Sequence, residues 1–326
     1  MEKATVVIPN FNGAEYIGSC IDSLYAQAAQ APEGFAIIVV DDASTDGSVQ
    51  LVRDRYPEVR LLCLEKNAGF SHAVNAGIRE ARTPYVILLN NDTVAKPGFV
   101  ASLVEAIEQR EDAFAVSARM LLWDRPELAD NAGDRYCALG WAYARGRGKP
   151  AAVLERPREV FSACGGAAIY RKTLFGRLGY FDERHFAYLE DVDLGYRARI
   201  YGYRSFYEPR AQVLHIGSAS SGSRYNPFKT RLVSANSVYL IWKNMPILQC
   251  LWNLPFLVLG FLIKTVYFFG KKMGILYVQG LWRGIKLCTG PEGRKAKVPF
   301  EWRNLGSYLA IQGQLYLNLL RFFTKG

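Results

Sequence analysis

Two short apolar runs, each followed at once by acids and amides, constrain the fold of this 326-residue chain most strongly. Residues 36–40 lead into Asp41 and Asp42, and residues 84–89 lead into Asn90-Asn91-Asp92. Unbroken β-branched runs of this length are typical of strands that are buried on both faces of a parallel sheet. Ligands of open α/β sheets bind outside the carboxyl ends of such strands. The sequence therefore predicts an oxygen-rich binding site at one edge of a sheet.

Strand and helix patterns alternate through the first hundred residues. Strands are expected at 4–9, 36–40, 59–64 and 84–89, and helices at 15–28, up to Arg55, at 71–81 and at 97–110. This alternation predicts an α/β protein with a doubly wound, mostly parallel sheet flanked by helices. Thr45 or Asp46 is the expected N-cap of the second helix. No GxGxxG motif follows the first strand, which argues against a dinucleotide-binding fold.

The next hundred residues have a mixed pattern. We expect a strand at 115–122, a basic loop at 144–150, a strand of small residues at 161–170 and a helix at 190–201. Small residues in a strand allow another backbone or a ligand to approach closely. The helix carries Glu190, Asp191 and Asp193 in its first turn, where acids also favour the helix N-terminus.

Nearly all of the net charge of +10 lies in the last hundred residues. Residues 226–326 contain 14 Lys and Arg against 2 Asp and Glu, whereas residues 1–225 contain 26 against 28. A basic tail can bind nucleic acid. Here the basic residues are interleaved with long apolar stretches, which favours an anionic membrane surface and not nucleic acid.

Three apolar segments lie in this tail, at 246–263, 275–287 and 305–323. The first is near the lower length limit for a membrane-spanning helix and contains two prolines. We favour helices that lie in the membrane interface over a true span, with a buried helical subdomain as the third option. The chain begins without a charged and then apolar leader, and its six scattered cysteines form no CxxC pair, so we expect reduced thiols and a cytoplasmic location.

Five motifs occur in an order that resembles the family 2 glycosyltransferases with a GT-A fold, especially their rhamnosyltransferase-like branch. They are residues 6–13 (VVIPNFNG), 39–48 (VVDDASTDGS), 67–70 (NAGF), 89–92 (LNND) and 190–194 (EDVDL). The resemblance covers about residues 4–220. It implies a catalytic domain at 1–225, with a nucleotide-sugar half at 1–110 and an acceptor half at 111–225, followed by a membrane-associating region at 226–326.

The resemblance also implies which residues bind the donor nucleotide sugar. Asp42 resembles the acid that accepts a hydrogen bond from the pyrimidine base, and Asp41 either shares this role or holds the turn. The remaining donor-binding candidates are Pro9, Asn10, Lys66, Asn67, Gly69, Phe70, Asn90 and Asn91. Gly69 is expected to let the backbone approach the donor, and the helix N-terminus that follows favours phosphate.

A metal site is expected at the end of the fourth strand. A nucleoside diphosphate is held most readily with Mg²⁺ or Mn²⁺, which takes oxygen ligands and stabilises the charge on the leaving diphosphate. The segment Asn90-Asn91-Asp92 occupies the place of the family's Asp-x-Asp motif, so Asp92 is the candidate ligand and Asn90 is a departure from the pattern. His215 is the second candidate ligand, because the resemblance places a histidine after the base helix.

Inverting transfer needs a general base that deprotonates the acceptor hydroxyl. Asp191 matches the family's base position, and Glu190 is expected to orient the acceptor. Capping of the helix by these acids is the alternative. The acceptor-side candidates that the resemblance implies are Cys164, Gly165, Gly166, Tyr180 and Phe181, of which the two aromatic residues can equally belong to the core.

Together these features predict an inverting glycosyltransferase on the cytoplasmic face of the cell membrane, attached peripherally or monotopically. The expected reaction moves rhamnose from dTDP-rhamnose to a lipid-linked or cell-surface glycan. Transfer of another hexose from a UDP-sugar and a degenerate, non-catalytic sugar-nucleotide or glycan-binding protein are the alternatives. A nucleotidyltransferase is disfavoured, because the loop after the first strand contains no basic residue.

Overall fold

The computed structural model describes residues 2–27, 34–217 and 226–324. The expected alternation of strands and helices in the first hundred residues is confirmed, with small shifts at the ends of the elements. The helix expected at 15–28 ends at Tyr25, and residue 28 lies outside the described residues. The elements of this part are β1 (Ala4–Asn10), α1 (Ile17–Tyr25), β2 (Phe35–Asp41), α2 (Ser48–Arg55), β3 (Arg60–Cys63), α3 (Phe70–Glu80), β4 (Tyr85–Leu89), β5 (Thr93–Ala95) and α4 (Phe99–Glu108).

The middle of the chain adds antiparallel strands and the helix with the acidic first turn. Its elements are β6 (Ala113–Leu122), β7 (Ala129–Asn131), β8 (Asp134–Cys137), β9 (Trp141–Ala144), η2 (Ala151–Leu154), β10 (Arg158–Val160), β11 (Ala167–Arg171), η3 (Lys172–Leu174), α5 (Phe175–Leu178), η4 (Glu183–His185), α6 (Glu190–Ile200) and β12 (Arg204–His215). The small-residue strand expected at 161–170 is shorter than predicted, because residues 161–166 form a bridge and a turn before β11 begins.

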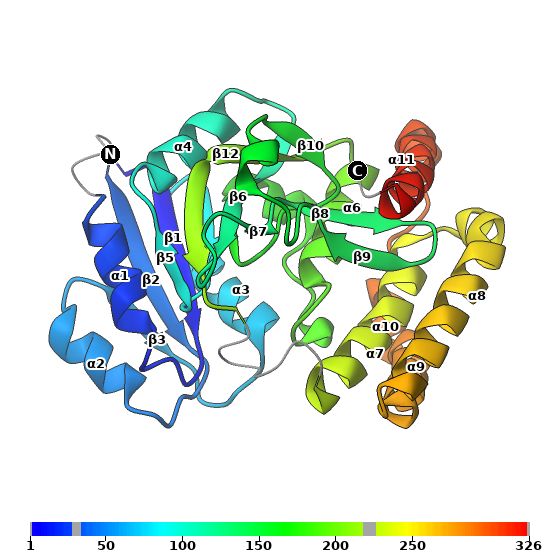
Figure 1. Ribbon diagram of the computed structural model, residues 1–326, viewed down its shortest axis with the longest axis horizontal. Helices are drawn as coiled ribbons and strands as arrows, with labels where there is room; N and C mark the ends of the chain where they lie inside the picture. The colour runs from blue at the N-terminus through cyan, green and yellow to red at the C-terminus, as the bar shows by residue number, and fades with distance from the viewer. Residues whose placement is uncertain (1, 28–33, 218–225, 325–326) are drawn as a thin grey trace.

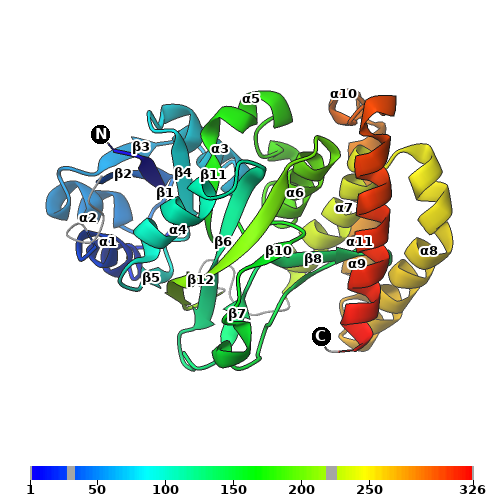
Figure 2. The same ribbon diagram turned by 90° about the horizontal axis from the view of Figure 1, so that it is seen from above.

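A 10-stranded sheet forms the centre of the molecule, with its main path in the order β10-β12-β6-β11-β4-β1-β2-β3 (Figures 1 and 2). Strands β3, β2, β1 and β4 are parallel, so their carboxyl ends share one edge. Strand β11 is antiparallel to both β4 and β6. Because Ala167 at the start of β11 pairs with Leu89 at the end of β4, the turn before β11 lies at this same edge.

Helices cover both faces of the sheet, as a doubly wound fold requires. One core cluster joins α1 and α4 to Val6, Ile8 and Ile87, and the other joins α3, α5 and α6 to Val7 and Val86. Alternate residues of β1 and β4 therefore enter opposite cores, which explains why both strands are apolar throughout.

The cap that the sequence predicts for α2 is placed differently in the structure. Gly47 is the N-cap residue, with φ at 84°, in place of Thr45 or Asp46. The Asp46 carboxylate still accepts hydrogen bonds from Ser48 N at 3.1 Å and from Ala14 N at 2.8 Å. Asp46 therefore fixes the loop after β1 to the start of α2.

The C-terminal region is helical, and its elements are α7 (Pro227–Asn244), α8 (Ile247–Gly270), α9 (Gly274–Thr289), α10 (Pro291–Ala296), η5 (Trp302–Asn304) and α11 (Leu305–Phe323). The three apolar segments of the tail form α8, α9 and α11, which lie together at one end of the molecule (Figure 2). Among the described residues, α8 is the only helix whose length and composition would allow it to cross a membrane. The predicted domain boundary at 225 lies outside the described residues.

The C-terminal helices are joined to α6 by buried polar contacts. Lys243 Nζ of α7 lies 2.8 Å from both Asp182 Oδ2 and Asp193 Oδ2, and all three side chains are buried. Tyr196 of α6 donates a hydrogen bond to Gln249 of α8 at 2.8 Å. Asp193 therefore does more than favour the helix N-terminus, because it anchors the C-terminal helices to α6.

Candidate functional site

Buried amides join the carboxyl ends of β1, β2 and β4. Asn10 donates from Nδ2 to Asp41 Oδ1 at 2.8 Å and accepts from Asn91 Nδ2 at 2.8 Å. Asp41 also accepts from Ser44 N at 2.9 Å, so its side chain holds the turn after β2. Three predicted donor-binding residues are thus brought together, with the partly buried Pro9 beside them, but their polar atoms mainly fix one another.

Asp42 links the end of β2 to the loop before α3. Its carboxylate accepts hydrogen bonds from Ala68 N at 2.9 Å and from Gly69 N at 2.8 Å. Burial raises the pKa of Asp42, and the two backbone donors oppose that rise. Each carboxylate oxygen can accept more than one hydrogen bond, so Asp42 keeps acceptor capacity for a ligand.

The loop before α3 contains exposed Lys66 and Asn67 and the partly buried Phe70. Gly69 has φ at 90°, and a Cβ placed on it would lie 2.6 Å from the carbonyl oxygen and ring of Phe186. The close approach at Gly69 is therefore made by Phe186 from the loop before α6. The sequence offers no signal for this contact, because the two residues are far apart along the chain.

Replacing Gly69 with Ala is expected to destabilise the protein and to displace the loop before α6. Gly47 provides a matched control, because its φ is 84° but a Cβ there would meet nothing within 4 Å. Gly47→Ala should cost about 1–2 kcal/mol from backbone strain alone. Gly69→Ala should cost more, because its ψ of 169° lies in a region that is essentially confined to glycine and because Phe186 must also move. Equal losses of unfolding free energy in thermal or denaturant melts would contradict this prediction.

Asp92 and His215 lie together where β5 pairs with the end of β12. His215 Nε2 is 3.4 Å from Asp92 Oδ1, and His215 Nδ1 is 2.7 Å from Asp130 Oδ2. Burial lowers the pKa of His215, but the hydrogen bonds and charges of Asp130 and Asp92 outweigh it and raise the pKa to about 9. Burial likewise would raise the pKa of Asp130, and the bond to His215 together with Arg147 holds it below its ordinary value.

This donor set suits a divalent cation. A carboxylate and an imidazole nitrogen converge, and a second carboxylate accepts from the other ring nitrogen. Carboxylate, histidine and metal commonly form such a triad, in which the outer carboxylate fixes the imidazole tautomer. Asp92 and His215 thus fit Mg²⁺ or Mn²⁺, with the imidazole favouring Mn²⁺.

Asp191, in the first turn of α6, contacts the turn before β11 at the same edge of the sheet. Its carboxylate accepts from Val192 N at 2.7 Å and from Gly165 N at 3.3 Å. Burial raises the pKa of Asp191, and these backbone donors oppose the rise. Asp191 is partly buried, and a carboxylate of this kind that receives hydrogen bonds can act as a base.

Gly165 and Gly166 separate the two groups of polar residues. Gly165 lies between Asp191 and the ring of Phe70, since a Cβ there would be 3.9 Å from Asp191 Cβ and 3.4 Å from the ring. Gly166 accepts from Asn90 N at 2.9 Å, and its position beside the Asn90 amide leaves little space for a side chain. The end of β4 and the first turn of α6 therefore meet across two adjacent glycines.

The predicted acceptor-side aromatics are placed mainly in the core. Phe181 is 2% exposed and packs with Tyr170 and Phe175, so its ring does not reach a site surface. Tyr180 stacks on Phe175 at 5.4 Å and lies beneath the Arg79 guanidinium. These contacts favour the alternative in which both residues belong to the core.

Sequence reasoning missed two acids that the structure brings to the site. Asp130 contacts His215, and Asp134 lies beside Asp191 and Cys164. Both belong to the polar segment Asp-Asn-Ala-Gly-Asp at 130–134, which interrupts a region of strands. That interruption is the one local signal that could have identified them.

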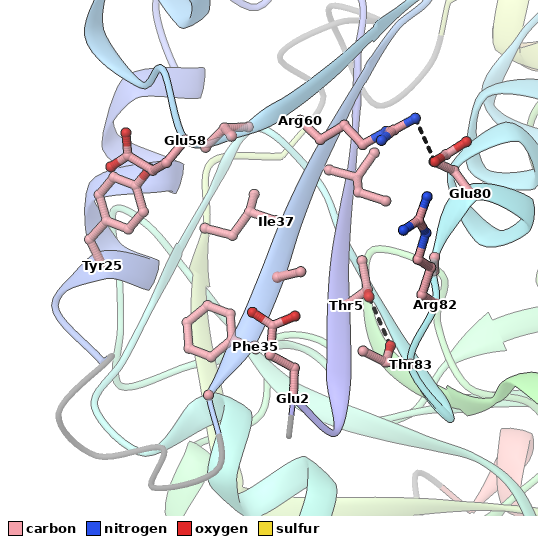
Figure 3. A pocket seen from close by; sticks show the side chains of 15 residues that line it. Glu2, Thr5, Tyr25, Phe35, Ile37, Glu58, Arg60, Glu80, Arg82 and Thr83 are labelled. Atoms are coloured by element: carbon pink, nitrogen blue, oxygen red, sulfur yellow. Dashed lines mark hydrogen bonds and ion pairs between the residues drawn. The ribbon is translucent and has the colours of Figure 1, made fainter.

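A separate groove lies at the amino ends of the parallel strands. Figure 3 shows its lining, including the Arg60–Glu80 ion pair at 2.6 Å and the hydroxyls of Thr5 and Thr83 at 2.8 Å. The groove contains none of the predicted site residues. Ligands of α/β sheets bind at the carboxyl ends, so we place the functional site at the opposite edge.

Comparisons with known proteins identify the family of the chain. The model of the family "Glycosyl transferase family 2" matches residues 5–179, more than half of the chain. The N-acetylglucosaminyl-diphospho-decaprenol L-rhamnosyltransferase of Mycobacterium tuberculosis is 34% identical over 220 residues, which cover 57% of this chain and 68% of that protein. The teichoic acid poly(glycerol phosphate) polymerase of Staphylococcus epidermidis is 35% identical over 134 residues, covering 40% of this chain and 18% of that protein.

Solved structures share the fold at low sequence identity. Residues 1–349 of S. aureus TarS in complex with UDP-GlcNAc superpose with a TM-score of 0.59 at 19% identity, covering 87% of this chain and 81% of that one. GalNAc-T7 with UDP, GalNAc and Mn²⁺ gives a TM-score of 0.60 at 17% identity, covering 74% of this chain and 48% of that one, so the chain spans about half of its length. With the family model matched over more than half of its length, the chain belongs to glycosyltransferase family 2 and is a glycosyltransferase.

Proposed function

We propose that this glycosyltransferase moves rhamnose, with inversion, from dTDP-rhamnose to a lipid-linked glycan. The observation that supports it most is the meeting of Asn90 and Asp191 across Gly165 and Gly166, because a donor and an acceptor must be held within reach of each other. The sugar is suggested by the mycobacterial rhamnosyltransferase, at 34% identity. Another hexose from a UDP-sugar is the second candidate, favoured by the fold shared with the UDP-GlcNAc complex.

In this proposal the nucleotide lies over the ends of β1 and β2. Asp42 accepts a hydrogen bond from the base, while Asn10, Asp41 and Asn91 hold the surrounding loops in place through their mutual hydrogen bonds. Pro9, Lys66, Asn67, Gly69 and Phe70 border the nucleotide and its phosphates. Asn90 contacts the ribose or a water molecule.

Asp92 and His215 would hold the divalent cation. When bound, the cation supplies charge stabilisation for the leaving diphosphate. Asp130 keeps His215 in the tautomer that leaves Nε2 free for a ligand. The Asn90 departure from the family's Asp-x-Asp pattern removes one carboxylate, so Asp92 and His215 provide the protein's share of the ligands.

Asp191 acts as the general base in this proposal. The acceptor oxygen attacks the anomeric carbon from the face opposite the diphosphate, and its proton passes to a carboxylate oxygen of Asp191. The bond between the anomeric carbon and the diphosphate oxygen breaks, and its electron pair leaves with the nucleoside diphosphate. Glu190, Cys164, Gly165 and Gly166 border the acceptor.

A donor panel tests the reaction. Purified full-length protein is incubated with Mn²⁺ and dTDP-rhamnose, UDP-galactose, UDP-N-acetylglucosamine or GDP-mannose, with and without a lipid extract as acceptor. Selective turnover of dTDP-rhamnose supports the proposal. Selective turnover of a UDP-sugar would instead identify that UDP-sugar as the donor. Binding without turnover under every condition would favour the non-catalytic binding protein instead.

We propose that the protein attaches to the cytoplasmic face of a membrane, and the exposed face of α8 supports the contact with a membrane. Its opposite face is held by the protein, since Asn253 Nδ2 donates to Gln312 Oε1 at 2.8 Å and Trp141 Nε1 donates to Gly260 O at 3.2 Å. These contacts hold one side of α8 against the rest of the protein. Large apolar side chains cover the other face, among them Leu248 at 73%, Leu251 at 60%, Trp252 at 60% and Val266 at 73% exposure. The arrangement favours a helix that lies in the interface.

Leu251→Glu is expected to weaken binding to anionic vesicles by about tenfold or more. The variant replaces an apolar side chain, whose burial in the membrane would contribute about 2 kcal/mol, with a charge. Val153→Glu is the matched control, since Val153 is 65% exposed but belongs to η2 and not to the C-terminal helices. Vesicle co-sedimentation measures both variants. Equal binding by both would contradict this membrane face, and resistance of wild-type protein to carbonate extraction would instead indicate a spanning helix.

A further inference from the structure

A buried acid, Asp134, lies beside the proposed base Asp191. One ligand atom from each of Asp134, Cys164 and Asp191 lies within 4.8 Å of the other two. Asp134 begins β8 and Asp191 belongs to the first turn of α6, so the fold brings together two carboxyl groups from different elements. Two carboxyl groups this close do not both ionise readily, and such pairs commonly share one proton.

The hydrogen bonds around the pair are unequal. Asp191 accepts from the backbone at Val192 and Gly165, and backbone donors stabilise an ionised carboxylate. Asp134 Oδ1 accepts a hydrogen bond from Asn131 Nδ2 at 2.8 Å. Asp134 Oδ2 is buried and has no hydrogen-bond partner among the described residues. If Asp134 Oδ2 carried a proton, it could donate a hydrogen bond to the Asp191 carboxylate.

The turn that carries Asp134 is built to hold it in this orientation. Gly133 donates from its backbone to Asn131 Oδ1 at 2.7 Å, which fixes the amide that binds Asp134. Gly133 has φ at 88°, and a Cβ there would lie 2.5 Å from a methyl carbon of Val160. Asp134 is 7% exposed, so its side chain has little freedom to turn toward solvent.

Among the titratable groups near the pair, the Asp130 carboxylate carries a charge that further raises the pKa of Asp134, whereas the pKa shifts of Glu190, Cys164 and Tyr170 favour their neutral forms. Burial raises the pKa of Glu190, and the adjacent charge of Asp191 raises it further. Burial likewise raises the pKa of the Cys164 thiol and of the Tyr170 hydroxyl. For Asp134, burial and then the charge of Asp191 raise the pKa. These directions agree with an Asp134–Asp191 pair that has one negative charge, carried by Asp191.

We propose that Asp134 is a positioning residue that retains a proton and donates it in a hydrogen bond to the Asp191 carboxylate. The inference rests on the proposed function, in which Asp191 is the base. The pair then carries one charge on the oxygen that faces the acceptor. After the acceptor hydroxyl transfers its proton to Asp191, both acids are neutral, and the loss of one proton to solvent restores the starting state.

Two substitutions distinguish this role from a general structural one. Asp134→Asn keeps the size and a donor, so the acid limb of the kcat–pH profile should stay close to that of the wild-type protein. Asp134→Ala removes the donor, so the acid limb should move upward by about one to two pH units, since a hydrogen bond to a charged group has about that effect. Turnover is measured as hydrolysis of the sugar nucleotide that the donor panel selects.

Other outcomes overturn the inference. If Asp134 were ionised, both substitutions would remove a negative charge and move the acid limb downward. If neither variant moves the limb, the pair is not in contact in the working enzyme. Wild-type protein without any turnover would mean that the proposed function fails, which is a different result from an unchanged profile.

An infrared measurement provides a test that needs no substrate. The difference spectrum of wild-type protein minus Asp134→Asn at neutral pH should contain the carbonyl band of a protonated carboxylic acid, shifted in D₂O. Absence of that band with a folded variant would show that Asp134 is ionised and would overturn the inference. The same measurement with added Mn²⁺ checks whether Asp134, Cys164 and Asp191 bind a cation instead, in which case the band would disappear.

Discussion

Asp191→Asn is expected to reduce turnover by about 10²–10⁴-fold, the usual contribution of a positioned general base. The amide has the size of the carboxylate and can still accept a hydrogen bond from Val192 or Gly165, so the first turn of α6 should remain in place. It cannot remove the acceptor proton. Donor affinity should be largely unchanged, because the proposed nucleotide site is formed by β1, β2 and β4.

The measurement combines single-turnover kinetics with titration of the sugar nucleotide. Asp112→Asn is the control, since Asp112 is an exposed acid, 3.4 Å from Arg204, and lies outside the site. Full activity of the control with loss of turnover in Asp191→Asn assigns the base. Unchanged turnover in Asp191→Asn would exclude Asp191 from this role.

The pH dependence has a defined sign. Burial raises the pKa of Asp191, and only the ionised form can accept a proton. Wild-type kcat should therefore rise with pH, through a pKa above the ordinary range of an aspartate. A profile whose acid limb lies at or below that range would contradict a partly buried Asp191 as the base.

The strand ends explain how much of the site could be predicted from sequence. Asp42 and Asp92 each follow an apolar strand, and parallel strands bring their carboxyl ends to one edge whatever the rest of the fold contains. The location of these two acids needed only local patterns and one general rule of sheet architecture. Asp191 and His215 were proposed from the resemblance to the family and not from a local pattern.

The residues that were missed depend on contacts between distant segments. Asp130 and Asp134 reach the site because β7 pairs with β6 and because β8 lies beside α6, neither of which is visible in a local pattern. Gly69 has its conformation because Phe186 packs against it. Phe181 follows Tyr180 in a segment that resembles an acceptor site, but its burial is decided by the packing of Tyr170 and Phe175.

The link between the C-terminal helices and α6 also depends on distant residues, and it leads to the largest stability effect that we expect. Lys243→Met should lower the free energy of unfolding by about 3 kcal/mol, at the lower end of the 3–5 kcal/mol typical of a buried ion pair that loses one partner. Asp182 and Asp193 would remain buried without the ammonium that lies 2.8 Å from each. The loss stays at the lower end because Arg184 and Arg197 still contact these two acids.

Lys295→Met is the matched control for this prediction. Lys295 is 75% exposed and lies 3.1 Å from Glu292, and exposed pairs of this kind contribute about 0–1 kcal/mol. Thermal unfolding of full-length protein in detergent, followed by circular dichroism, compares the two variants. Similar melting temperatures for both would show that Lys243 does not hold the C-terminal helices to α6.

The pH dependence separates a charge effect from a packing effect. Burial opposes ionisation of Asp182 and Asp193, but Lys243 and the neighbouring arginines outweigh it, so the pKa of each acid lies below its ordinary value. Acids with a lowered folded-state pKa stabilise the protein above their unfolded pKa of about 4 and lose this contribution as the pH falls. The deficit of Lys243→Met should therefore be largest near neutral pH and shrink as the acids become protonated. A deficit that is constant with pH would mean that Lys243 acts through packing of its aliphatic stem, and it would contradict a charged link between the C-terminal helices and α6.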